Sequence, residues 1–259
     1  RTLQQRGAER ILSFTDENSQ DDERWSLGHS WTQHNYAFLL ERVLDEPRLG
    51  LILKPKVPST LRKRLGPVAR LLERAEKTGR CLVLDGGDVK GRHGSVPPAA
   101  AALASDVMVH GHLFAATAGV ESALAGVPTL LLDREGWTVS PFYRLGVGRV
   151  VFTGWDALWR ACREHWTRPG GIPGFGDWSS MLDELDPFRD GRAAERVGTF
   201  LHWLLEGFDA GLDRDQALTR AVERYAAQWG RDKVIEVAGG PSTAERAGQP
   251  AVVEPVSVA

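Results

Sequence analysis

The sequence ATAGVESALAGVPTLLL, residues 116–132, carries the pattern from which the fold class follows. Gly119 and Val120 open a short helical segment, residues 120–125, and Gly126 stands where a helix-ending glycine belongs. Residues 128–132 form a continuous apolar run, which is typical of a strand buried on both faces of a parallel sheet. A loop, a helix and a buried strand in this order make up one repeat of an α/β fold.

Further short apolar runs lie on either side of this repeat and alternate with helical segments. The runs occupy residues 11–14, 49–53, 81–84, 107–109 and 149–152, and helical spacing of apolar residues covers residues 31–44, 60–77, 97–104 and 155–166. This alternation predicts an α/β fold with a Rossmann-like parallel sheet of about six strands and helices on both faces. The order of the strands in the sheet does not follow from the sequence alone.

Two longer helical patterns come after the last predicted strand, at residues 190–212 and 214–229, and Asp213 is suited to cap the second helix. Residues 238–259 mix Gly, Pro, Ser, Glu and Val without any period, which predicts a disordered tail. We therefore expect one domain with C-terminal helices over residues 1–237 and a tail over residues 238–259.

Composition excludes several classes of protein. The chain has 259 residues, a net charge of -2 and two cysteines, so no broad positive charge attracts nucleic acid, and we expect reduced thiols in a cytoplasmic protein. No run approaches the roughly 20 apolar residues that cross a bilayer, and no Cys/His cluster has zinc spacing, so we expect no metal. The chain begins at Arg1 directly before a strand-like segment, and we expect this start to be truncated.

The start of the helix within residues 116–132 is suited to bind a diphosphate, because helix N-termini present free amide groups and a partial positive charge. We expect phosphate contacts at Thr117, Ala118 and Gly119, where the glycine lets a ligand approach the backbone closely. Glu121, expected in the first turn, is suited to accept hydrogen bonds from a ribose diol. The alternative is an ordinary amphipathic helix in which Glu121 only stabilises the helix dipole.

The segment GVESALAGVP, residues 119–128, resembles the G-x-E-A-L-A-x-G-x-P element of GT-B glycosyltransferases. In that superfamily the element lies in the C-terminal, donor-binding Rossmann-like domain, and its acidic residue commonly holds the nucleotide ribose. The resemblance gives that role to Glu121 and the phosphate contacts to Thr117, Ala118 and Gly119. It implies that residues 1–237 are the nucleotide-sugar-binding half of such an enzyme, with a nucleotide-sugar as substrate and no separate cofactor.

The chain departs from the retaining branch of that superfamily, which often carries a second glutamate eight positions before the ribose-binding one. That position is Leu113 here. The strings KPK at residues 54–56 and DPFRDGRAAER at residues 186–196 look more like bacterial surface-polysaccharide glycosyltransferases. The resemblance implies transfer to a hydroxyl of an acceptor glycan or lipid-linked sugar. It also implies an absent N-terminal domain that supplies the acceptor site, the catalytic base and any peripheral association with the inner face of the membrane.

Polar residues that directly follow the predicted strands are further candidates, because ligands bind at the carboxyl edge of a parallel sheet. Lys54 follows the second strand and is suited to neutralise a departing diphosphate, although a solvated loop end is equally compatible with its position. Contacts to the donor sugar or base are expected from residues after the other strands, namely Asp85, His110, His112 and Arg134. The residues expected to line the donor sugar together with Arg134 are Glu135, Gly136, Ser140 and Tyr143. The two histidines are equally well explained as structural hydrogen-bonding residues, and Asp85 as part of an ordinary loop.

Two other functions fit the same sequence. A sugar-nucleotide epimerase shares the fold and carries similar motifs, but it needs no acceptor. A non-catalytic partner domain in polysaccharide assembly would use exposed tryptophans. The chain has nine tryptophans in total. Most tryptophans pack in cores or between helices, and this favours the glycosyltransferase interpretation.

Overall fold

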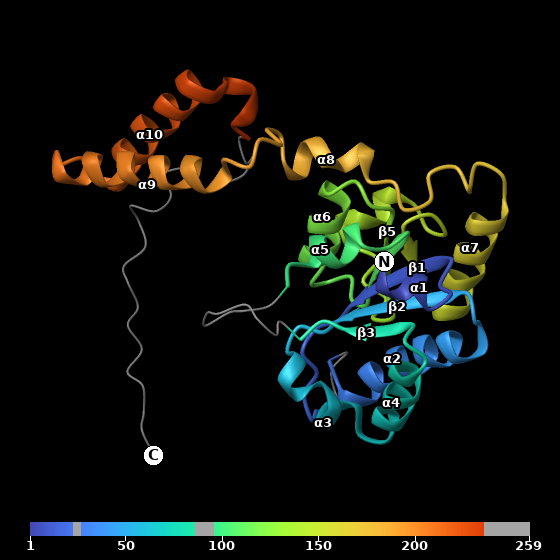
Figure 1. The fold of residues 1–259 in the computed structure, drawn as a ribbon. Helices are drawn as coiled ribbons and strands as arrows, with labels where there is room; N and C mark the ends of the chain where they lie inside the picture. Colours follow the sequence, from blue (N-terminus) through green and yellow to red (C-terminus); the bar gives the residue numbers. More distant parts are fainter. Residues whose placement is uncertain (23–26, 86–95, 236–259) are drawn as a thin grey trace, which may run out of the picture. The chain divides into compact units, whose positions relative to one another are not determined.

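The computed structural model describes residues 1–22, 27–85 and 96–235, so the predicted tail at residues 238–259 lies outside the described residues. The chain divides into two compact units, Arg1–Asp186 and Pro187–Ala259. The first unit contains a sheet with helices around it, and the described part of the second is a helical hairpin (Figure 1).

One sheet of six parallel strands forms the centre of the first unit. The strands are β1 Arg10–Thr15, β2 Leu49–Lys54, β3 Cys81–Val83, β4 Val107–His110, β5 Thr129–Leu132 and β6 Val151–Phe152. They lie in the order β3-β2-β1-β4-β5-β6. The predicted α/β fold, with a Rossmann-like parallel sheet and additional C-terminal helices, is confirmed.

Helices cover both faces of this sheet (Figure 1). One face packs against α2 His29–Asp45, α3 Leu61–Leu65, α4 Ala69–Lys77 and α7 Trp155–Thr167, whose buried residues share a cluster with Phe14 and Leu53. The other face packs against α1 Thr2–Gln5, α5 Pro98–Leu103 and α6 Thr117–Leu124, next to Ile52 and Met108. Alternate residues of each strand therefore face different helix layers.

The helix expected over residues 60–77 is interrupted in the structure. Short turns, η1 Pro58–Thr60 and η2 Gly66–Val68, lie before and after α3, and α4 begins only at Ala69. The interruption has a local cause, because Gly66 has a φ of +50° and Pro67 lacks the amide hydrogen that a continuing helix needs. Sequence periodicity alone extended the helix across this break.

The remaining elements of the first unit are η3 Pro141–Leu145 and α8 Ser179–Leu185. The second unit contains α9 Ala193–Asp209, α10 Arg214–Trp229 and η4 Arg231–Lys233. The predicted cap of α10 is confirmed, since the Asp213 side chain accepts from the Gln216 amide at 2.8 Å and the Gln216 side chain accepts from the Asp213 amide at 3.1 Å. In the described part of the chain, no helix has both the length and the apolar character to cross a bilayer.

Candidate functional site

The carboxyl ends of β1 and β4 mark the point where the strand order reverses. From β1 the chain continues to β2 and β3 on one side, and β4, β5 and β6 follow on the other. In open α/β sheets, ligands bind outside the carboxyl ends of the strands at such a switch point. The candidate site is therefore built from the residues that follow β1, β2, β4 and β5.

Three polar residues form a row across the ends of the central strands. Thr15 of β1 is in register with Lys54 of β2 and with His110 of β4. Residues in register on parallel strands project from the same face, and here that is the face of Ile52 and Met108, which packs against α5 and α6. The row therefore lies on the side of the sheet from which α6 begins.

His110 is held entirely by the protein. The side chain is fully buried, its Nδ1 lies 2.7 Å from the Thr15 hydroxyl, and its Nε2 lies 2.9 Å from the Ala115 carbonyl. A carbonyl can only accept, so Nε2 carries the proton and Nδ1 accepts from Thr15. Burial, with the neighbouring His112, lowers the pKa of His110 to about 3. With both ring nitrogens engaged, His110 joins β1 to the turn before α6, which matches its structural interpretation.

Lys54 and Lys56 differ in their surroundings. The Lys56 ammonium pairs with Glu17 at 2.5 Å. Lys54 is only 8% exposed, and no ion pair or hydrogen bond joins its ammonium group to any described residue. A lysine whose side chain is mostly covered and whose ammonium group has no carboxylate partner is suited to receive an anionic group of a ligand.

The turn from β4 into α6 places the predicted phosphate contacts in the first turn of the helix. α6 begins at Thr117, earlier than the sequence indicated, and the preceding residue, Ala116, offers no capping side chain. The Thr117 amide donates to the Ala115 carbonyl at 2.9 Å. Thr117 is exposed and Ala118 is half-buried, and the first amide groups of a helix are the ones that its own carbonyls leave free to donate to a phosphate.

Gly119 has a packing reason to be glycine. It is buried, and a Cβ atom there would lie 3.0 Å from the Leu131 side chain and 3.6 Å from the Trp178 ring. The absence of a side chain lets α6 approach β5 and Trp178 closely. The glycine therefore needs no ligand to explain it, and any phosphate contact it makes goes through its amide group.

Glu121 is the fifth residue of α6, so it lies in the second turn and not in the first turn as expected. Its side chain is partly exposed. No hydrogen bond or ion pair joins the Glu121 carboxylate to any described residue, in contrast to the carboxylates of Glu17 and Glu135. An acidic side chain left free on the helix that follows β4 is available to accept hydrogen bonds from a ligand.

His112 and Glu135 form a buried pair between the loops that follow β4 and β5. His112 Nδ1 lies 2.8 Å from Glu135 Oε1, and the side chains are 2% and 8% exposed. His112 Nε2 and Glu135 Oε2 are both buried without a partner in the described structure. Such unpaired polar atoms are rare in folded proteins, so this pair distinguishes His112 from the fully bonded His110.

The two remaining predicted contacts lie apart from α6. Arg134 follows β5, but its guanidinium lies 4.3 Å from the ring centre of Trp31 and donates to Asn35 at 2.9 Å, so it is held against α2. Burial lowers the pKa of Arg134. Asp85 is exposed and follows β3. Because β2 and β1 lie between β3 and β4, these two strands are three strand spacings, or about 14 Å, apart.

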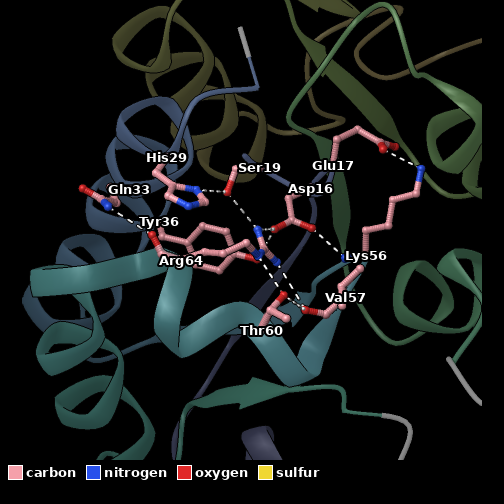
Figure 2. Close-up of polar contacts among 10 residues, drawn as sticks. All are labelled: Asp16, Glu17, Ser19, His29, Gln33, Tyr36, Lys56, Val57, Thr60 and Arg64. Atoms are coloured by element: carbon pink, nitrogen blue, oxygen red, sulfur yellow. Dashed lines mark hydrogen bonds and ion pairs between the residues drawn. The ribbon is translucent and has the colours of Figure 1, made fainter. Parts of the chain in front are cut away.

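Asp16 is the first of several acidic residues that follow β1, a composition typical of a solvated loop, but it is buried at the end of the strand (Figure 2). It accepts from the Lys56 amide at 2.6 Å and from the Tyr36 hydroxyl at 2.9 Å, and Arg64 lies 3.5 Å away. Burial raises the pKa of Asp16, and the Arg64 charge opposes this shift.

Arg64 is also buried and uses its remaining donors on Ser19, Thr60 and the Val57 carbonyl. Figure 2 shows Ser19, from the segment after β1, and Val57 and Thr60, from the segment after β2, around Arg64 of α3. The network fixes those two loops and leaves none of its charges free, so its role is to hold the edge beside Lys54. The sequence did not predict this network, because Asp16, Tyr36 and Arg64 come from three separate segments of the chain.

The structure thus brings Lys54, His110, His112 and the start of α6 to one edge and one side of the sheet, and it sets Asp85 and Arg134 apart. Comparison of the chain with models of known protein families, with curated proteins and with solved structures finds no match.

Proposed function

We propose that the first unit binds a nucleotide-sugar at the carboxyl edge of the sheet and acts as the donor-binding part of a glycosyltransferase in surface polysaccharide synthesis. One observation carries the proposal. At the point where the strand order reverses, the β4–α6 turn shares the carboxyl edge of the sheet with Lys54, a mostly buried lysine without an acidic partner, and α6 carries Glu121, an acid without a basic partner.

The chemistry of a nucleotide-sugar fits these groups. Its diphosphate is an anion that amide groups at the start of α6 and the Lys54 ammonium stabilise. Negative charge increases on the diphosphate as the sugar leaves, so the same contacts strengthen in the transition state. The ribose hydroxyls donate to the Glu121 carboxylate. The attacking group is a hydroxyl of the acceptor, and no described residue is assigned as its base.

Titration calorimetry with UDP-, CMP-, GDP- and dTDP-sugars tests the proposal. We expect one class of nucleotide to bind. Loss of a charged hydrogen-bond acceptor in Glu121→Gln should weaken its affinity by about tenfold, and Lys54→Met should weaken it by a similar factor.

Glu223→Gln and Lys77→Met are matched controls, because both side chains are exposed on helices far in sequence from this edge. They should bind as the unsubstituted chain does. If no member of the panel binds at high protein concentration, or if Glu121→Gln binds as tightly as the control, the proposal is wrong.

A further inference from the structure

The loops after β4 and β5 repeat one arrangement. Each carries a polar residue with a buried side chain, followed two positions later by an exposed aromatic residue. These are His112 and Phe114 in the first loop, and Glu135 and Trp137 in the second. Because β4 and β5 are neighbours in the sheet, the two loops lie side by side at the carboxyl edge.

The aromatic residues stack on each other at the surface. The ring centres of Phe114 and Trp137 are 6.1 Å apart with 25° between the planes, and the side chains are 39% and 49% exposed. Large aromatic rings normally bury most of their area. Two that stack on each other and still face solvent form an apolar surface that is ready for a flat ligand.

The polar residues connect the same loops underneath. The His112 ring meets the Phe114 ring edge-on at 5.5 Å, and its Nδ1 lies 2.8 Å from Glu135 Oε1. This bond fixes the distance between the loops and so holds Phe114 beside Trp137. A purely structural connection would leave no polar atom unpaired, yet His112 Nε2 and Glu135 Oε2 are both buried without a partner in the described structure.

We propose that Phe114, Trp137, His112 and Glu135 form a subsite for a pyranose ring, an assignment that rests on the proposed function for the source of the sugar. The C–H groups on one face of a pyranose pack against aromatic rings, whose faces carry partial negative charge. Two ring hydroxyls donate, one to His112 Nε2 and one to Glu135 Oε2, after the half-exposed Phe114 ring shifts. The sugar belongs either to the nucleotide donor or to an acceptor glycan.

A lipid surface is the competing ligand for exposed aromatic residues. Val139, in the same loop as Trp137, is 85% exposed and would join them in a membrane interface. A lipid surface gives no reason for a buried histidine–glutamate pair with two unpaired atoms, since acyl chains supply no hydroxyl. The polar pair therefore favours a sugar.

The test follows Trp137 directly, by ¹⁹F NMR of the full chain labelled with 5-fluorotryptophan, with the Trp137 signal assigned from Trp137→Phe. Its four titrants are methyl pyranosides at high concentration, nucleotide-sugars, the matching nucleoside diphosphates, and vesicles of phosphatidylglycerol and phosphatidylethanolamine. We expect the signal to shift with pyranosides, with nucleotide-sugars or with both, according to whether the ring comes from an acceptor or a donor. A shift with the nucleoside diphosphate alone, or with vesicles but no sugar, overturns the subsite.

Substitutions separate stacking from the polar pair. For the sugar that shifts the signal, Trp137→Ala and His112→Gln should each weaken binding by about tenfold. Both should leave the affinity for the nucleoside diphosphate unchanged. Val139→Ser, on the same loop, should alter neither affinity, whereas it would weaken binding to vesicles.

The two proposals fail in different ways. If nucleotides bind but no sugar moves the Trp137 signal, the subsite is wrong and the nucleotide site stands. If pyranosides move the signal but no nucleotide binds in calorimetry, the nucleotide site is wrong and the subsite stands.

Discussion

His110 shows how one buried side chain orders the candidate site. Its two ring nitrogens connect β1, through Thr15, with the Ala115 carbonyl just before α6. The position of the α6 start therefore depends on a neutral imidazole that keeps both bonds. Sequence inspection found the residue because it follows a strand, but it left open whether His110 binds a ligand or the protein. The hydrogen bond from Thr15, which is 95 positions away in the sequence, shows that His110 binds the protein.

The low pKa of His110 predicts a pH dependence of stability. The folded protein holds the ring neutral down to about pH 3, whereas the unfolded chain protonates it near the ordinary value of about 6.5. Stabilisation is therefore complete above about pH 6.5 and is lost as the pH falls, by about 1.4 kcal/mol per pH unit for one proton.

Urea unfolding at pH 7 and pH 5 measures this effect. The unsubstituted chain should lose about 2 kcal/mol more over this range than His110→Gln, which cannot take up the proton. Equal losses in both proteins would show that His110 is protonated in the folded state.

The buried pair of Asp16 and Arg64 makes a second prediction at this scale. Arg64→Met leaves the Asp16 carboxylate buried next to Tyr36 without its cation, so we expect a loss of about 3–5 kcal/mol in the free energy of unfolding. The double variant Asp16→Asn, Arg64→Met removes both charges and should be more stable than Arg64→Met alone. A double variant as unstable as the sum of the single ones would contradict this account.

The helix α6 has both a packing role and a proposed binding role. Its first turn carries the predicted phosphate contacts, while Gly119 lies against Leu131 and Trp178. α9 also contains a glycine, Gly198, where an added Cβ atom would meet no other atom within 4 Å. Glycine thus has a close-packing role at position 119 of α6 and no such role at position 198 of α9.

Replacing each glycine by alanine should therefore change stability in opposite directions. Gly119→Ala forces a methyl group against Leu131 and should cost about 1–3 kcal/mol. Gly198→Ala fills open space in a helix and should add about 0.5–1 kcal/mol. Thermal unfolding of the two variants checks the signs, and a stabilising Gly119→Ala would show that α6 does not pack as described.

The sequence predicted the helices and strands better than it predicted the contacts between them. Short apolar runs identify the strands because each is buried on both faces, and Asp213 indicates the start of α10. The break at Gly66 was missed because apolar spacing continues through it. Both His112 and Glu135 were expected to contact a ligand because they follow strands, but their pairing was not predicted, since it depends on β4 and β5 lying side by side.

At the level of the whole molecule, the buried apolar clusters of the described chain all lie in the first unit, as do Lys54, Glu121 and Trp137. A chain of residues 1–186 should therefore fold and bind the same nucleotide as the full chain, with an affinity within about threefold, since no proposed contact is removed. Circular dichroism and calorimetry of both chains measure this. A folded fragment that has lost nucleotide binding would place part of the site in the second unit.

All six strands of the sheet run in one direction, so every loop that leaves a carboxyl end opens onto the same rim. The apolar core beneath that rim is separate from the loop residues that would bind a ligand. Exchanging or lengthening one of these loops can therefore change what is recognised while the hydrophobic core keeps its packing. The loop between β5 and η3, which holds Trp137 and Val139, is the natural place to redesign specificity.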